Sequence, residues 1–311
     1  SACAYPYEAN NQGVSFFARD INDVSGEEIA RHYSADSIRL LAGCAPCQPF
    51  STYNQGKNTS QDKKWPLLYA FARIIRDVLP ELVTMENVPD VTKHKVYQDF
   101  IETLGQQGYS LWADDVLCAD YGVPQMRRRH VLLASRIGHI KLLPPTHSGR
   151  HQTVRDAIGH LPPIHAGETC VHDSLHRSAK LSDLNLRRIR ASKPGGTWAD
   201  WPESLQAACH TRTSGKTYKW VYSRMEWDKP APTMTTQCYG FGNGRFGHPE
   251  QDRAISLREA AIFQGFPENY TFSPDGKIFR NTVAKMIGNA VPVGLGTVIG
   301  KSFQCAIASK G

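Results

Sequence analysis

Short apolar runs alternate with helical patterns between residues 14 and 135, as they do in βαβ units. The runs that predict strands lie at 14–18, 38–42, 82–85, 109–117 and 130–134. Apolar residues at helical spacing, bounded by capping residues, prolines and glycines, predict helices at 25–33, 67–78 and 96–104. Together these segments predict an α/β fold, a Rossmann-like sheet with helices on both faces.

The pattern changes near residue 145. Residues 145–250 carry many Pro, Gly, His, Trp and basic residues without sustained periodicity, which indicates a separate, irregular lobe. Regular patterning returns with a capping box at Ser256 to Glu259, a helix at 277–287 and a last helix that has Pro292 in its first turn. We therefore predict a catalytic domain over 1–145, a second domain over 146–250, and a return to the first domain over 251–311.

Composition narrows the class of protein only a little. The chain has 311 residues, of which 41% are hydrophobic and 21% charged, as in many soluble proteins. A formal charge of +7 and a pI near 9.0 favour a polyanionic partner, although many basic proteins bind no nucleic acid. No apolar stretch approaches the roughly 20 residues of a membrane span, and no secretory signal is visible. The eight cysteines are scattered, so we expect no disulfide framework and a cytoplasmic protein.

Three reactive groups stand at the boundaries of predicted strands. Cys47 lies in a tight turn after the 38–42 strand, Glu86 follows the 82–85 strand, and Arg129 precedes the 130–134 strand. Open α/β sheets bind ligands at the edge where parallel strands end, so these side chains are candidates for one site. A thiolate there can act as a nucleophile, while the carboxyl and guanidinium groups stabilise the charge that its attack creates.

These residues resemble the core motifs of the DNA cytosine-C5 methyltransferases. The similar blocks are Pro46-Cys47-Gln48, Glu86-Asn87-Val88, Gln125-x-Arg127-x-Arg129, Arg258-Glu259-Ala260-Ala261, Gln264-Gly265-Phe266-Pro267 and Gly288-Asn289-Ala290-Val291-Pro292. They occur in the family's order over nearly the whole chain. The resemblance implies methyl transfer from S-adenosyl-L-methionine to a cytosine flipped out of double-stranded DNA, in a bacterial or phage-encoded restriction–modification system. It also implies that the 146–250 lobe is a target-recognition domain.

The same resemblance implies roles for individual residues. Cys47 is the nucleophile, Glu86 faces cytosine N3, and Arg129 faces O2. Further roles follow for the catalytic motif (Gln125 and Arg127), for the cofactor site (Asp20, Ile21, Pro46, Leu67, Asn289 and Val291) and for substrate or DNA (Gln48, Ser51, Asn87 and Arg245).

One feature of the family is absent. Its members open with a strand and a glycine-rich turn for the methionine part of the cofactor, and residues 1–10 instead resemble a later helix. We therefore expect a truncated amino terminus, or a second polypeptide that supplies the first motifs. Two alternatives remain at this point: a cytosine-C5 methyltransferase that acts on transfer RNA, and an inactive DNA-binding fragment with an incomplete cofactor site.

Simpler interpretations compete with several of these roles. Cys44 and Cys47 have the spacing of a redox pair, although such a pair leaves Glu86 and Arg129 unexplained. The spacing of Cys170, His172, Cys209 and His210 fits no common zinc site, and we expect no bound metal. Aromatic and basic residues of the lobe either contact DNA or build the core of the lobe, and the candidates are Trp198, Trp201, Arg212, Lys216, Tyr218, Lys219, Tyr222 and Arg224.

Overall fold

The computed structural model describes residues 2–44, 66–212, 218–274, 276–277 and 279–309, and these residues form two compact units. The sheet unit comprises Ala18–Leu117, Arg128–Pro145 and Leu295–Gly311. The lobe unit comprises Ser1–Phe17, Cys118–Arg127 and Thr146–Gly294. The chain therefore passes repeatedly between the units, and each unit is built from segments far apart in sequence.

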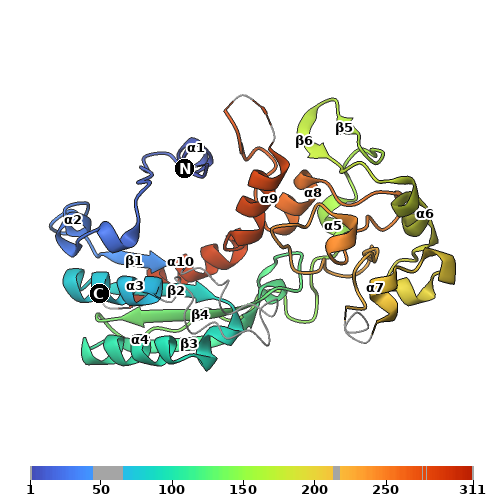
Figure 1. Ribbon diagram of the computed structural model, residues 1–311. Coiled ribbons are helices and arrows are strands. Elements are labelled where there is room, and N and C mark those ends of the chain that lie inside the picture. The colour runs from blue at the N-terminus through green and yellow to red at the C-terminus, as the bar shows by residue number, and fades with distance from the viewer. Residues whose placement is uncertain (1, 45–65, 213–217, 275, 278, 310–311) are drawn as a thin grey trace. The chain divides into compact units, whose positions relative to one another are not determined.

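A four-stranded mixed sheet forms the centre of the sheet unit (Figure 1). Its order is β1 (Leu40–Gly43), β2 (Leu82–Asn87), β4 (Arg128–Ser135) and β3 (Ser110–Leu117). β1 runs parallel to β2, whereas β4 is antiparallel to both β2 and β3. The strands predicted at 38–42, 82–85, 109–117 and 130–134 are therefore confirmed.

The strand predicted at 14–18 is wrong. Val14 and Phe17 are exposed, Phe17 by 62%, and the Phe16 N–H donates to the carboxylate of Glu8. An apolar run becomes a strand only when a neighbouring strand completes its hydrogen-bond ladder. Residues 14–18 make no such ladder within the described part of the chain, so their apolar character produces an extended segment instead.

Two amphipathic helices cover one face of the sheet. Strand alternation places Val83 and Met85 of β2 on that face, where they share a core with Phe71 of α3 (Pro66–Val78) and Phe100 of α4 (Lys95–Gln106). The rings of Phe71 and Phe100 stack with their centroids 5.7 Å apart. Both helices were predicted from the spacing of their apolar residues, and this packing confirms them.

Smaller elements complete the sheet unit. Ser25 caps α2 (Gly26–Ala30) by accepting a hydrogen bond from the Glu28 N–H, as its sequence predicts. Most of α10 (Val293–Ala308) also belongs to this unit, and Pro292 precedes its first turn.

The stretch Arg280–Ala308, which includes α10, is long and apolar enough to cross a membrane by length and composition, contrary to the sequence-based expectation. The core helices of many soluble proteins pass the same test, so this single stretch is weak evidence.

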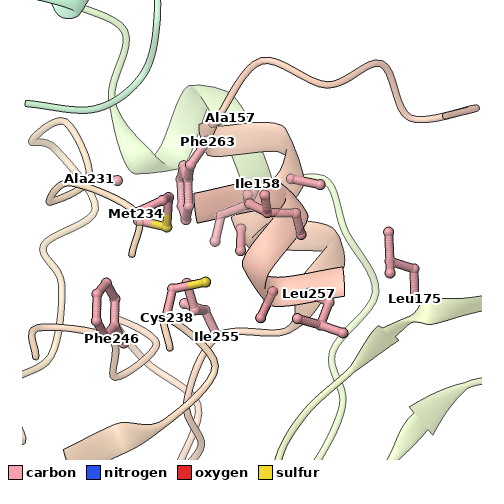
Figure 2. Packing of buried hydrophobic residues seen from close by; sticks show 14 of the residues in the cluster. Ala157, Ile158, Leu175, Ala231, Met234, Cys238, Phe246, Ile255, Leu257 and Phe263 are labelled. Carbon is pink, nitrogen blue, oxygen red and sulfur yellow. The ribbon is translucent and has the colours of Figure 1, made fainter. Parts of the chain in front are cut away.

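The main core of the lobe unit surrounds α8 (Leu257–Phe263). Figure 2 shows Leu257 and Phe263 of this helix among Ile158, Met234 and Phe246, which come from other segments. The helices are α1 (Ala4–Asn10), α5 (Val154–Ile158), α6 (Asp183–Ala191), α7 (Ala208–Thr211), α8 and α9 (Arg280–Asn289), and the hairpin is β5 (Thr169–Cys170) with β6 (Asp173–Arg177). Both hydrogen bonds of the capping box predicted at Ser256 and Glu259 are present: the Glu259 N–H donates to the Ser256 hydroxyl, and the Ser256 N–H donates to the Glu259 carboxylate.

A second, aromatic core lies elsewhere in the lobe unit. Trp198 and Trp201 are buried there with Phe241, and His210 stacks on Trp198 at a centroid distance of 4.5 Å. These two tryptophans therefore build the lobe rather than present their rings to DNA. Among the described residues, no group of three or more His, Cys, Asp or Glu side chains is arranged to hold a metal ion.

A buried histidine makes the stability of the lobe unit depend on pH. Burial lowers the pKa of His248 from 6.5 to about 4, although the Glu259 carboxylate opposes that shift. The unfolded chain takes up this proton below pH 6.5 and the folded chain does not, so stability present above pH 6.5 is lost as the pH falls toward about 4. When the pH falls from about 7 to about 5, we expect the free energy of unfolding to decrease by about 2 kcal/mol because of His248.

His248→Asn is expected to abolish this contribution. The His248 ring Nδ1 accepts hydrogen bonds from the Glu250 and Gln251 N–H groups, and an Asn side chain offers an oxygen near the same place without titrating. Urea unfolding of both proteins at the two pH values, followed by tryptophan fluorescence, measures the difference. An equal loss of stability in the variant would contradict the assignment.

Candidate active site

Glu86 and Arg129 form an ion pair at one end of the sheet. Arg129 Nε lies 2.7 Å from Glu86 Oε1, and both side chains are only 11% exposed. Glu86 on β2 is registered with Val131 on β4, two residues beyond Arg129, so alternation puts both side chains on the same face. The Arg129 Nη1 also donates to the Arg128 carbonyl, which holds the guanidinium in place. The structure thus brings together two of the three groups predicted to do chemistry.

Cys44 is the last described residue before the segment that holds the third group. Cys44 follows β1, beside the end of β2, and the charges of Glu86 and Arg129 both act on its thiol. Part of the residue is exposed, but protein atoms surround the sulfur. This burial of the sulfur, together with the negative charge of Glu86, raises the pKa of the Cys44 thiol to about 12. Cys44 is therefore a neutral thiol at physiological pH, which disfavours a redox role. Four predicted site residues, Pro46, Cys47, Gln48 and Ser51, lie outside the described residues.

A buried hydrogen-bonded chain lies on the opposite face of the same strands. The His130 ring accepts or donates a bond of 2.7 Å with the Tyr97 hydroxyl and one of 2.8 Å with the Asp115 carboxylate. Asn87, predicted to contact substrate, is paired with His130 in the sheet and is buried, and its side-chain oxygen accepts from the Val88 N–H. Sequence reasoning missed this chain; a histidine opening an otherwise apolar strand was the available signal.

Gln125 and Arg127 are fully buried in the lobe unit and bond to its backbone. Gln125 donates to the Phe263 carbonyl and to Gln264 Oε1, and its own oxygen accepts from the Met234 N–H. Arg127 donates to the Met234 and Gly288 carbonyls at 2.9 and 3.1 Å. These two members of the Gln-x-Arg-x-Arg block therefore join three distant segments of the lobe.

Gln264 extends this buried network to the last predicted motif. Its side-chain amide donates to the Ala290 carbonyl at 2.6 Å, and its backbone carbonyl accepts from the Val293 N–H. Asn289 is the last residue of α9, and Val291 follows in the turn held by these bonds. The network therefore determines the backbone course around both predicted cofactor residues.

Gly288 lets this turn approach the neighbouring backbone. A Cβ at this position would lie 2.4 Å from the Thr235 carbonyl carbon and from the Thr236 nitrogen, and backbone atoms cannot rotate away. We expect Gly288→Ala to destabilise the lobe unit by about 2 kcal/mol, the usual cost of overpacking. Thermal unfolding measures it, and Gly296→Ala, where a Cβ meets nothing within 4 Å, is the control.

Asp20, Ile21 and Leu67 lie in the sheet unit. Asp20 caps a 3-10 turn (Ile21–Asp23) by accepting from the Asn22 N–H, and Ile21 packs against the sheet core. Arg73 of α3 donates to the carbonyls of Ile21 and Val24, which fixes the turn against the helix that begins beside Leu67. The structure therefore places Asp20 and Ile21 against α3, the helix that also carries Leu67.

Comparison with known proteins identifies the class to which this fold and this acid–guanidinium pair belong. The model of the C-5 cytosine-specific DNA methylases matches residues 1–305. The Type II methylase M.HgiDII of Herpetosiphon aurantiacus is 52% identical over 307 residues, which cover 97% of this chain and 86% of that protein. The Type II methyltransferase M1.HphI of Haemophilus parahaemolyticus is 31% identical, over 92% of this chain and 73% of that protein.

Solved structures agree with the fold. A prophage-encoded DNA modification methyltransferase from E. coli matches with a TM-score of 0.64 and 19% identity, over 93% of this chain and 85% of that one. The Dnmt2 methyltransferase of S. pombe matches with a TM-score of 0.57 and 17% identity, over 96% and 86%. The chain belongs to the C-5 cytosine-specific DNA methylase family, whose members are enzymes. The predicted resemblance and the α/β fold are confirmed, and the alternatives of a transfer-RNA enzyme and an inactive fragment gain no support.

Proposed function

We propose that this protein is a sequence-specific DNA cytosine-C5 methyltransferase of a Type II restriction–modification system, acting in the bacterial cytoplasm. It transfers a methyl group from S-adenosyl-L-methionine to a cytosine flipped out of double-stranded DNA. The observation that carries this proposal is the Glu86–Arg129 pair at the end of β2, beside the end of β1. Cys47 follows Cys44 by three residues, which span at most about 11 Å. We propose that Cys47 supplies the nucleophile that works with this acid and guanidinium.

Each of the three groups has a defined task. The Cys47 thiolate forms a bond to cytosine C6, and the ring electrons move toward C5, N3 and O2. The Glu86 carboxyl holds a proton at N3 while Arg129 donates to O2, so the charge that develops on the ring is neutralised. The C5 carbon thereby becomes nucleophilic. Once C5 has taken the methyl group, loss of the C5 proton restores the C5–C6 double bond and expels the thiolate, which returns Cys47 to its starting state.

Both Glu86 and Arg129 are already oriented for these tasks. Their ion pair is 11% exposed on each side, so the pair is shielded from bulk water yet open to a ligand. Charge–dipole interactions are stronger in such a place than in water, and the donors need little reorganisation when the base arrives. The base must be extruded from the duplex because a stacked cytosine does not expose C6 to attack from its face.

The described residues fit the adenosine part of S-adenosyl-L-methionine. The Asn22 backbone and side chain both donate to Asp20 Oδ1, and among the described residues Oδ2 receives no hydrogen bond, so it can accept from an adenine amino group. Ile21 supplies apolar surface next to Asp20. Leu67 of α3, and Asn289 and Val291 on a turn of the lobe unit, are further candidates. When bound, the cofactor supplies an electrophilic methyl group.

Asp20→Ser tests the adenine contact. Serine still caps the 3-10 turn, because its hydroxyl can accept from the Asn22 N–H, but it removes the carboxylate. We expect the Kd for S-adenosyl-L-methionine to rise about 10-fold, as the loss of one hydrogen bond to a charged group predicts. Isothermal titration calorimetry measures it, with Asp23→Ser on the same turn as the control, and equal affinities for the two variants would contradict the role of Asp20.

Covalent trapping tests the whole proposal. A duplex library that carries 5-fluorocytosine, incubated with the protein and S-adenosyl-L-methionine, should give an adduct that survives denaturation, because fluorine cannot leave C5 as a proton does. Peptide mapping should place the adduct on Cys47. A library in which transfer RNA replaces DNA should give none. The absence of an adduct with any duplex, or an adduct on Cys44, would refute the proposal.

A further inference from the structure

Arg245 and Trp220 form a stacked pair in the lobe unit. The guanidinium carbon of Arg245 lies 4.3 Å from the centroid of the Trp220 ring, within the range of a cation–π contact. Trp220 is nonetheless 48% exposed, and its neighbour Tyr218 is exposed as well. The pair is therefore on the surface, and the indole orients the guanidinium without covering it.

The loop of Arg245 is built to hold the side chain in this place. Phe246 is buried in the main core of the lobe unit, and Gly244 has a φ of +157° with a virtual Cβ only 2.7 Å from the Phe246 ring. A larger residue at position 244 would displace that ring. Arg245 consequently projects from a loop whose next residue is anchored.

Within the described part of the chain, the Arg245 side chain lacks a hydrogen bond that its desolvation requires. Its Nε is buried and has no partner among the described residues, and burial lowers the pKa of the guanidinium against the opposing charge of Glu226. A second Arg–Trp pair in the same unit shows the usual solution: Arg155 lies 5.2 Å from the Trp227 ring and donates from Nε to Asp228 at 2.8 Å. Arg245 has the same aromatic support, but no described residue supplies an acceptor to its Nε.

The missing acceptor is best supplied by a planar group with two adjacent acceptors. Guanine offers such a pair, O6 and N7, in the major groove, and a guanidinium held in one plane matches it with two parallel hydrogen bonds. A phosphate also accepts two bonds, but the Glu226 carboxylate already contributes negative charge at Arg245, which its ion pair with Lys229 at 2.9 Å offsets in part. The neutral base edge suits this environment better.

We propose that Arg245, oriented by Trp220, reads a guanine in the DNA sequence that the enzyme recognises. The inference rests on the proposed function, because it names one specificity-determining contact of the same DNA complex. Pre-orientation by the indole lowers the entropy lost on binding, and an incorrect base leaves the desolvated Nε without a partner. Discrimination at that base pair should therefore be strong.

A selection experiment tests this contact independently of catalysis. The full-length protein selects duplexes from a library with randomised positions around a fixed cytosine, and the selected sequences give the preference at each position. The wild-type protein should require guanine at one position where Arg245→Ala loses about 10- to 100-fold of the preference and Trp220→Leu loses part of it. Preferences at the other positions should stay unchanged, and Arg155→Ala should keep them all.

Other outcomes would overturn the inference. A uniform loss of affinity across all sequences, with the salt dependence of binding reduced by the equivalent of one contact, would show that Arg245 holds a phosphate. An unchanged preference in Arg245→Ala, or no sequence preference in the wild-type protein, would show that it reads no base. Arg245→Lys retains the charge and covers the case in which the alanine variant unfolds: it too should lose the guanine preference, because lysine lacks the planar fork. Failure of methyl transfer with intact selection would refute the proposed function alone.

Discussion

Cys47→Ser is expected to abolish methyl transfer, with a fall in kcat of at least about 10⁴-fold, the scale of losing a catalytic nucleophile. Serine keeps the size of the side chain, but its hydroxyl does not ionise near neutral pH and cannot add to cytosine C6. Binding of duplex DNA should change by less than about 3-fold, since the contacts with the phosphates remain. Transfer of a labelled methyl group and a gel-shift titration measure the two quantities.

Cys44→Ser is the matched control for this experiment. Cys44 is three residues away and its thiol, with a pKa raised to about 12 by burial and by Glu86, remains neutral. We expect its replacement to change kcat by less than about 10-fold, because a neutral thiol is a poor nucleophile. Retention of activity in Cys47→Ser together with its loss in Cys44→Ser would move the nucleophile to Cys44 and overturn the assignment.

The approach of Glu86 to Arg129 could be predicted from the sequence because it follows from local rules. Both residues stand at the boundary of a strongly apolar strand, and such strands pair side by side. The alternation of side chains then limits each residue to one of two faces. The apolar pattern does not determine the register of β2 against β4. This register places Arg129 diagonally across from Glu86 rather than one residue further along.

The buried network of Gln125, Arg127 and Gln264 could not be predicted in the same way. The backbone partners of Gln125 and Arg127 belong to residues more than a hundred positions away, and a backbone carbonyl has no signature in a sequence. Polar residues in an irregular lobe look alike whether they face solvent or satisfy a buried turn. The family resemblance indicated that the block matters, while the structure shows that two of its three members act by holding the lobe together.

The same limit applies to the tryptophans and to residues 14–18. Trp198 and Trp201 are buried, whereas Trp220 is half exposed, and nothing in the flanking residues separates the two cases. Burial depends on whether distant segments meet the ring. Residues 14–18 illustrate the converse, because their apolar pattern is that of a strand and the neighbour they need is absent from the described residues.

Glu259→Gln is expected to destabilise the lobe unit by about 3–5 kcal/mol, the cost of breaking a buried ion pair from one side. Arg253 donates to both Glu259 oxygens at 2.7 Å, and both side chains are 1% exposed. Burial alone raises the pKa of Glu259, but the hydrogen bonds and charge of Arg253 outweigh it and hold that pKa at about 2. A glutamine leaves the Arg253 charge buried without its counter-ion. It also weakens the cap of α8, because Glu259 accepts from the Ser256 N–H.

Denaturant unfolding of three variants separates the charge effect from the cap. Asp228→Asn breaks the exposed pair with Arg155 and should cost less than about 1 kcal/mol, as surface ion pairs do. The double variant Arg253→Met, Glu259→Gln removes both charges but still leaves a side-chain acceptor for the Ser256 N–H, so it should recover most of the stability lost in Glu259→Gln. If the double variant is no more stable than Glu259→Gln, the loss comes from the cap and from packing rather than from an uncompensated arginine. If Glu259→Gln costs no more than Asp228→Asn, the buried pair does not stabilise the lobe at all.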